Sequence, residues 1–183
     1  MVNRDVCHIR LHNMELQAER IIDPTLKTRP VAIISSHHSN GTIISLSSEA
    51  KEEGLCQGMK ISMVRKMSHT TQLLPYNQSL YDRLNRYIYR TVSSFTPVVE
   101  PHRLNEFFLD LGGMGSIYDN IKNTGFTIIK RIKEQISIHG TIGISENKLV
   151  SQIITAVIPD IIHKIDRGYE SQFLAPLNPK LLP

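Results

Sequence analysis

Side chains that can bind metal ions lie in two short segments of the sequence. The first holds His12 and Glu15, and the second holds Glu106. Carboxylates and imidazoles are common ligands of divalent ions, so His12, Glu15 and Glu106 form one candidate metal site. The alternative is that these are polar side chains at a strand-to-helix corner and bind no ligand.

The overall charge is compatible with a nucleic-acid partner but does not require one. The chain of 183 residues has 21 Lys and Arg against 17 Asp and Glu, a net charge of +4. Many proteins that never bind nucleic acid have a similar excess. Basic residues cluster on two helical patterns, where solvent-exposed helix faces explain them as well as phosphate contacts do. These clusters are Arg83, Arg86 and Arg90, and Lys130, Arg131 and Lys133.

Composition predicts an intracellular globular protein. The chain is 40% hydrophobic and 21% charged, which is ordinary for one core with a small appended subdomain. Apolar runs such as 31–34 are much shorter than the roughly 20 residues that cross a bilayer, and the N-terminus lacks a signal-peptide pattern. We therefore expect no membrane association. Cys7 and Cys56 are too few for a disulfide framework or a zinc knuckle.

The apolar spacing predicts an α+β fold around the candidate site residues. Two long helices are indicated by apolar stripes, one from Leu80 to Phe95 and one from Ile117 to Ile136. The predicted strands are 6–11, 30–34, 42–45, 98–100, 107–111 and 141–144, and the predicted shorter helices are 13–20, 47–54, 61–67 and 147–157. A Gly112–Gly113 turn follows the fifth strand. This order favours an antiparallel-rich sheet with the two long helices on one face and a small inserted subdomain.

Four segments resemble the Y-family (translesion) DNA polymerases of the DinB, UmuC and ImuB type. Ser94–Pro101 leads into Leu104–Asp110, which is similar to the family's palm pattern FTP-VEP-SLDEA-LD, and Gly143–Lys148 is similar to its GIS-NK turn. Ser48–Met59 resembles the fingers pattern YEAR-FGV-GM, and Arg29–Ala32 resembles the strand GKPVAV. The segments occur in the family's order over nearly the whole chain.

The resemblance implies a division into palm and fingers. The palm is expected to comprise residues 1–10 and 76–166, with the fingers inserted at residues 11–75. Residues 167–183 resemble the family's approach to the thumb. We therefore expect the thumb and the little finger to be absent from this chain.

The same resemblance implies that the metal site has been lost. The family holds two Mg²⁺ ions with carboxylates, which neutralise the charge that develops during phosphoryl transfer. Arg10 stands at the essential aspartate of the first strand and His12 at the second, while Asn105 replaces the aspartate beside Glu106. A guanidinium about 4 Å from a divalent ion repels it by roughly 8 kcal/mol at an effective dielectric of about 20. We expect no cofactor, Glu106 as the single surviving family ligand, and an ion pair between Arg10 and Glu106.

The positions that hold the incoming nucleotide in the family have also changed. Ser48 and Lys51 stand where the family has a tyrosine and an arginine of the fingers, and Glu15 stands at the aromatic steric gate. Lys51 keeps a positive charge but not a bidentate guanidinium. The later palm lysine falls at 156–159 and has no counterpart. Together these changes predict that templated synthesis is lost.

The resulting prediction is a pseudo-polymerase of translesion synthesis and DNA repair. It is expected to bind DNA weakly, without sequence preference and in a salt-sensitive way. Other repair or replication proteins are the further expected partners, and the expected location is the cytoplasm, at the nucleoid. The residues expected to contact DNA phosphates are Lys60, Arg65, Lys66 and Arg103, together with Lys51.

Two alternatives stay open from the sequence. A divergent nucleotidyltransferase would use Glu106 with Asp110 and His12 around one metal ion. A protein-interaction scaffold would keep the same fold without affinity for DNA, because a fold does not dictate a function. Asp110 is expected to cap the turn at Gly112 rather than to bind metal.

Overall fold

The chain divides into two compact units in the computed structural model, which describes residues 5–112 and 120–181. Residues 1–12 and 84–183 form one unit, here called the five-stranded unit after its sheet, and residues 13–83 form the three-stranded unit. The sequence predictions at Gly113 and Ile117 lie outside the described residues. The palm and fingers limits derived from the resemblance stay a prediction.

The five-stranded unit is built on a mostly antiparallel sheet with the strand order β5-β6-β1-β7-β8. Strand β1 lies in the middle and pairs antiparallel with both β6 and β7, whereas β8 pairs parallel with β7. The side chains of β1 therefore have cross-strand neighbours on both sides. The strands are β1 (Val6–Leu11), β5 (Val99–Arg103), β6 (Glu106–Asp110), β7 (Gly140–Ser145) and β8 (Ile162–Lys164).

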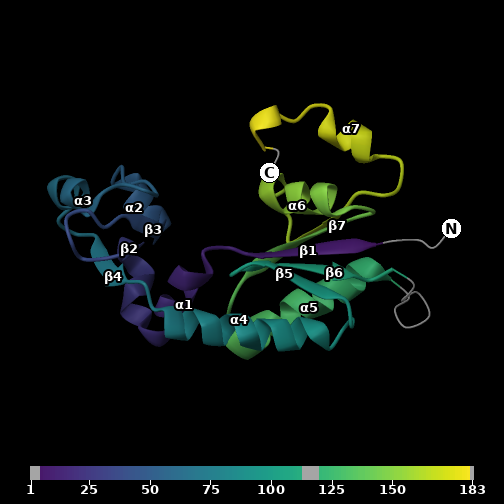
Figure 1. Cartoon of the computed structure of the whole chain (residues 1–183), viewed down its shortest axis with the longest axis horizontal. Coiled ribbons are helices and arrows are strands. Elements are labelled where there is room, and N and C mark those ends of the chain that lie inside the picture. The colour runs from purple at the N-terminus through teal and green to yellow at the C-terminus, as the bar shows by residue number, and fades with distance from the viewer. Residues whose placement is uncertain (1–4, 113–119, 182–183) are drawn as a thin grey trace. The chain divides into compact units, whose positions relative to one another are not determined.

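Helices cover the two faces of this sheet differently (Figure 1). Helix α5 (Ile121–Ile136) and the part of α4 (Gln78–Ser93) that belongs to this unit lie on one face, and α6 (Lys148–Val157) lies on the other. The prediction of two long helices on one face is confirmed. The unit also contains α7 (Glu170–Leu174) and a 3₁₀ helix, η3 (Pro179–Leu181).

The strand period decides which side chains of β1 face which helices. Ile9 is paired in register with Ile142, whose side chain lies against Gly125 of α5. Since successive strand residues point to opposite faces, Cys7, Ile9 and Leu11 face the long helices, and all three are fully buried. The even-numbered residues of β1 therefore point to the face that carries α6.

A glycine in β7 lets α6 approach the sheet closely. A Cβ atom at Gly143 would lie 2.2 Å from the carbonyl oxygen of Ser151, so a side chain here would force α6 away. His8 stands opposite Gly143 in register, and its Nδ1 lies 2.8 Å from Oγ1 of Thr155 in α6. The close approach therefore brings a polar helix side chain into contact with the buried imidazole.

The three-stranded unit has the strand order β3-β2-β4. Strand β2 pairs antiparallel with β3 and parallel with β4. Its elements are α1 (Met14–Ile22), the 3₁₀ helix η1 (Pro24–Thr28), β2 (Val31–Ile34), β3 (Ile43–Leu46), α2 (Ser48–Glu52), α3 (Ile61–Met67) and β4 (Gln72–Pro75). One buried apolar cluster of this unit comprises Ala32, Ile34, Ile43, Leu46, Ala50, Leu55, Ile61 and Val64.

The sequence prediction missed two strands, β4 and β8. Strand β4 has no apolar alternation and ends in Pro75, and β8 spans three residues shortly after Pro159. Neither segment has the periodic signal or the length that predicts a strand. Within the described residues, none of the helices combines the length and the hydropathy needed to cross a membrane.

Candidate functional site

Three charged residues form a row across the α6-facing side of the five-stranded sheet. Glu106 of β6 is paired in register with Arg10 of β1 on one side and with Arg103 of β5 on the other. Directly opposed residues of antiparallel strands point to the same face. Nε of Arg10 lies 3.4 Å from Oε1 of Glu106, and Nε of Arg103 lies 3.7 Å from Oε2. We call these residues the Arg–Glu–Arg row, and the predicted ion pair between Arg10 and Glu106 is confirmed.

Glu106 is the buried member of the row and is surrounded by nitrogen atoms. Its side chain is 3% exposed, whereas those of Arg10 and Arg103 are 38% and 62% exposed. Nε2 of His8 and Nε2 of His102 each lie 3.9 Å from Oε2 of Glu106. One carboxylate therefore faces two guanidinium groups and two imidazoles.

Burial keeps His8 in its neutral form. Nδ1 of His8 forms a hydrogen bond with the Thr155 hydroxyl at 2.8 Å, and the same hydroxyl lies 2.8 Å from the carbonyl oxygen of Gln152. Burial lowers the pKa of His8 to about 3, and the Coulombic effects of His102 and the two arginines of the row act in the same direction. His8 therefore presents a neutral imidazole toward Glu106, not a positive charge.

Asn105 has a structural contact that an aspartate could not make. It lies in the turn between β5 and β6, where its carbonyl oxygen accepts from the Leu11 N–H at 2.9 Å. Its side-chain Nδ2 donates to the carbonyl oxygen of Leu11 at 2.8 Å. A carboxylate has no N–H to donate, so the amide at this position ties the turn to the end of β1.

The donor set of the row does not fit a pair of magnesium ions. Mg²⁺ requires an octahedral shell of oxygen ligands at about 2.1 Å. Glu106 is the one carboxylate of the row, and each of its oxygens lies within 4 Å of a guanidinium nitrogen. Asp110 lies four residues further along the extended β6, about 13 Å away, and its Oδ1 accepts from the Gly112 N–H at 2.9 Å. Across 5–112 and 120–181, no group of three His, Cys, Asp or Glu is arranged to hold a metal ion.

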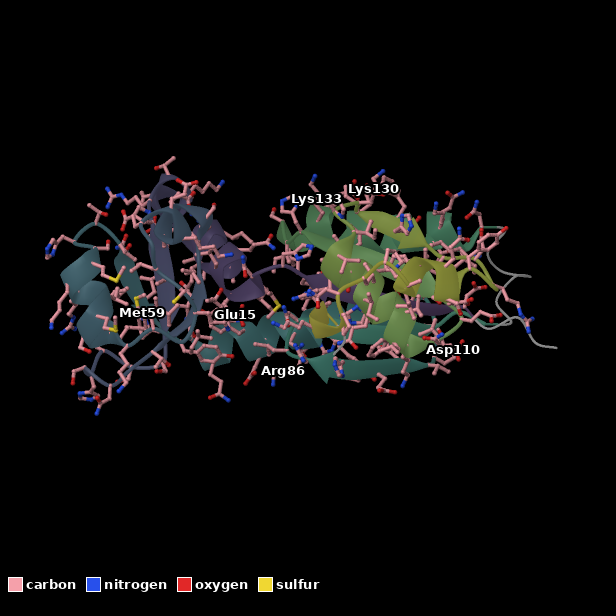
Figure 2. All side chains as sticks on the ribbon, turned by 90° about the horizontal axis from the view of Figure 1, so that it is seen from above. Glu15, Met59, Arg86, Asp110, Lys130 and Lys133 are labelled. Atoms are coloured by element: carbon pink, nitrogen blue, oxygen red, sulfur yellow. The ribbon has the colours of Figure 1, made fainter. Side chains whose placement is uncertain are left out.

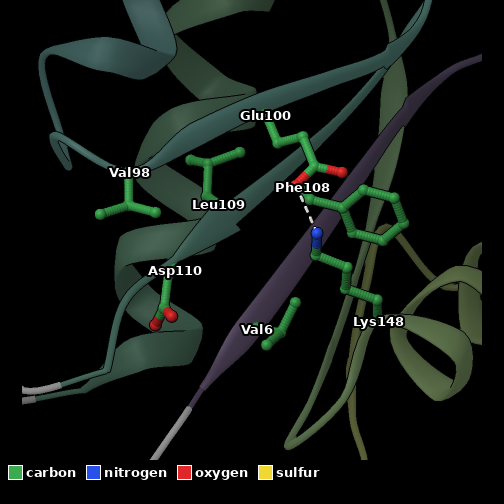
Figure 3. A pocket seen from close by; sticks show the side chains of 7 residues that line it. All are labelled: Val6, Val98, Glu100, Phe108, Leu109, Asp110 and Lys148. Carbon is green, nitrogen blue, oxygen red and sulfur yellow. Dashed lines mark hydrogen bonds and ion pairs between the residues drawn. The ribbon is translucent and has the colours of Figure 1, made fainter.

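A shallow pocket of about 90 Å³ lies on β5 and β6, beside α6. Figure 3 shows the Lys148 side chain running along the Phe108 ring to form an ion pair with Glu100. Nζ of Lys148 lies 5.4 Å from the ring centroid. The lysine and the glutamate neutralise each other, so the pocket offers an aromatic surface more than a catalytic pair. Its lining residues are Val6, Val98, Glu100, Phe108, Leu109, Asp110 and Lys148.

The predicted nucleotide-binding positions all lie in the three-stranded unit. Helix α2 begins at a serine cap, where Ser47 Oγ accepts from the Ala50 N–H at 3.2 Å. The Glu49 carboxylate of α2 accepts a hydrogen bond from Arg20 of α1 at 2.9 Å, which attaches α2 to another helix of the three-stranded unit. Ser48 and Lys51 are exposed on α2, and Glu15 is partly buried in the first turn of α1.

The predicted DNA-contacting residues are divided between the two units. Lys60, Arg65 and Lys66 lie at and along α3, and Arg103 lies in β5. All four side chains are exposed. The basic clusters of the long helices are exposed as well. Figure 2 shows Lys130 and Lys133 of α5 on one edge of the five-stranded unit and Arg86 of α4 on the opposite edge.

Two neighbours of Glu106 were missed by reasoning from the sequence. The signal for His8 was present, because residues two apart on a strand share a face and His8 precedes Arg10 by two. His102 had no such signal. It lies at a register shift in the pairing of β5 with β6, between Pro101 and Arg103, and the sequence does not mark such shifts.

Known proteins resemble this chain over almost its whole length. The model of the impB/mucB/samB family matches residues 11–156. DNA polymerase IV of Dehalococcoides mccartyi is 29% identical over 184 residues, which cover 100% of this chain and 47% of that polymerase. DNA polymerase IV 2 of Mesorhizobium japonicum is 26% identical over 97% of this chain and 42% of its own length. The chain spans about half the length of the curated relatives it matches.

Solved structures share the fold. The crystal structure of DinB from Sulfolobus solfataricus has a TM-score of 0.87 and 20% sequence identity, covering 98% of this chain and 53% of its own. A Dbh ternary complex has a TM-score of 0.85 at 20% identity, with coverage of 98% and 53%. The predicted α+β fold of the polymerase palm type is confirmed by this likeness.

Proposed function

We propose that this chain, which belongs to the impB/mucB/samB family of Y-family polymerases, binds DNA without carrying out two-metal nucleotide transfer. The family and the fold make the chain Y-family translesion polymerase-like. The loss of catalysis is the proposed part, and so are the substrates and partners, since the relatives are about twice as long. We place the protein in translesion synthesis or DNA repair, as a module that contacts DNA or recruits other repair or replication proteins.

The Arg–Glu–Arg row carries this proposal. By the sequence resemblance, Arg10 and Asn105 stand where the family has metal-binding aspartates. Arg10 is more than one third exposed, so water screens its repulsion of a divalent ion to less than the roughly 8 kcal/mol obtained at about 4 Å with an effective dielectric of about 20. Even at the dielectric constant of bulk water, the repulsion at about 4 Å is about 2 kcal/mol, which weakens metal binding about 30-fold.

The domain assignment belongs to the proposal. We assign residues 1–10 and 76–166 to the palm, residues 11–75 to the fingers, and residues 167–183 to the start of the connection to the thumb. The division of the chain into residues 13–83 and the remainder supports an inserted fingers subdomain. We further propose a cytoplasmic, nucleoid-associated location, which follows from DNA binding.

Primer extension together with metal binding tests the loss of catalysis. With Mg²⁺ or Mn²⁺ the chain should not extend a primer. Because weak DNA affinity could also prevent extension, Mg²⁺ binding is measured separately by thermal unfolding. The double variant Arg10→Asp/Asn105→Asp should gain a rise in Tm with Mg²⁺ that the unaltered chain lacks. Extension that Glu106→Ala abolishes would establish an active nucleotidyltransferase and overturn the proposal.

DNA binding is tested by fluorescence anisotropy on primer-template DNA at two salt concentrations. The expected contacts are to phosphates, so affinity should fall steeply between about 50 and 200 mM salt, with a slope that counts the contacts. Replacing Lys60, Arg65 or Lys66 with glutamine should reduce that slope by about one each. Lys133→Gln, on the exposed side of α5, is the matched control and should leave the slope unchanged. No binding at low salt would favour the scaffold function, and salt-independent binding would contradict phosphate contacts.

A further inference from the structure

The guanidinium groups of the Arg–Glu–Arg row have more hydrogen-bond donors than their contacts with Glu106 use. Arg10 and Arg103 approach Glu106 through Nε, one at each carboxylate oxygen. A guanidinium carries five N–H groups in a rigid planar fork. Within the described part of the chain, the Nη atoms of neither arginine have a hydrogen-bond partner. Both forks therefore keep their outer donors available.

The positively charged arginines of the row are exposed to solvent, whereas the negatively charged Glu106 is buried. Glu106 forms the floor of the row at 3% exposure, and the more exposed Arg10 and Arg103 flank it on neighbouring strands. Two guanidinium groups outnumber one carboxylate, so the row keeps a net positive charge. A ligand that arrives from solvent meets the guanidinium groups first, and an anion is attracted where a divalent cation is repelled.

We propose that the row binds one phosphate group directly, with Arg10 and Arg103 as its ligands and without a metal ion. Arg–phosphate pairs are charge-assisted and often bidentate, and a tetrahedral phosphate accepts from two forks that converge on it. Both forks lie within 4 Å of the same carboxylate, so a single phosphate above Glu106 is within reach of both. Glu106 is a positioning residue, since its two carboxylate oxygens hold the two guanidinium groups beside each other through their Nε atoms.

The inference rests on the proposed absence of metal ions at this place but does not require affinity for DNA. The phosphate can belong to a nucleic-acid strand or be free phosphate, and the chemistry of recognition is the same. Inorganic phosphate alone is therefore the first probe. If phosphate binds and primer-template DNA does not, the proposed function fails and this inference stands.

The test is a calorimetric titration of the chain with inorganic phosphate, in metal-free buffer at constant ionic strength. One phosphate per chain is expected, and Arg103→Gln should weaken binding about tenfold, the effect of losing one charge-assisted contact. Arg86→Gln is the matched control, because it removes the same charge from an exposed position on α4 and should not change the affinity. Arg10→Gln should weaken binding as well. If that variant fails to fold because Glu106 loses its nearest partner, the more exposed Arg103 still carries the test.

Three results would overturn the inference: no saturable binding, an equal loss in Arg86→Gln, or binding that appears only after Mg²⁺ is added. A second titration identifies the source with two single strands that differ only in a 5′ phosphate. We expect the phosphorylated strand to bind more tightly and Arg103→Gln to remove the difference. Equal binding of the two strands, with binding of inorganic phosphate intact, would rule out a strand terminus as the source of the phosphate.

Discussion

The two faces of the five-stranded sheet differ in what their side chains do. The face toward α4 and α5 carries apolar residues such as Ile9 and Phe107, both fully buried. The face toward α6 carries charges and imidazoles, with Glu106 flanked by two arginines. The same strands form both faces, so β1 and β6 serve two purposes with alternating residues.

The comparison teaches that the fold and the chemistry of such a sheet can change independently. Apolar residues at every second position of a strand are enough to bury that face of the sheet against the long helices. This burial does not depend on which side chains the other positions place on the opposite face. Residues 11–156 match the family model, while the α6-facing side of the sheet presents a single carboxylate between two arginines. Retention of the fold is therefore no evidence that catalysis is retained.

The largest expected effect is on the apolar face. Phe107→Ala should lower the free energy of unfolding by about 3–5 kcal/mol, because it removes a fully buried aromatic ring and leaves a cavity. Denaturant unfolding followed by circular dichroism measures this change. Phe126→Ala, on the exposed side of α5 with 53% of the residue exposed, is the control and should cost less than about 1 kcal/mol. Equal losses would mean that the apolar face does not dominate stability.

The next effect comes from the neutral imidazole on the opposite face. The pKa of His8 is lowered from 6.5 to about 3, so the folded state excludes a proton that the unfolded state binds. This stability is fully present above pH 6.5 and is lost as pH falls toward 3. Between pH 7 and pH 5 the free energy of unfolding should fall by about 2 kcal/mol. His8→Gln should remove that part of the pH dependence, and an unchanged slope in the variant would show that another group titrates.

The sequence predicted the elements of the apolar face well and the chemistry of the other face only in part. Helices α4 and α5 and strand β1 follow from apolar spacing, because burial imposes a period on the residues. The ion pair between Arg10 and Glu106 followed from the resemblance, since both positions belong to adjacent strands of the palm. The position of His102 depends on a register shift, and the bond of Asn105 to Leu11 depends on the geometry of one turn. Such details arise from tertiary structure and produce no periodic pattern in the sequence.

Introducing the aspartate that the sequence resemblance implies for position 105 should cost stability. Asn105→Asp replaces the Nδ2 donor with a carboxylate oxygen that faces the carbonyl oxygen of Leu11. The expected loss is about 1–2 kcal/mol, because a hydrogen bond becomes a contact between two acceptors. Thermal unfolding measures it, and Asn123→Asp, on the exposed face of α5, is a matched control. If both variants lose the same amount, the amide at 105 has no structural role.

The smallest effect on stability is expected at the most exposed member of the row. Arg103→Gln removes an ion pair whose arginine is 62% exposed, and such pairs contribute about 0–1 kcal/mol because water screens them. Denaturant unfolding should therefore barely change, while the affinity for inorganic phosphate falls. This separation distinguishes a residue retained for a ligand from one retained for the fold. A loss of several kcal/mol would instead show that Arg103 is needed to compensate the buried charge of Glu106, and that the charged face supports the fold as the apolar face does.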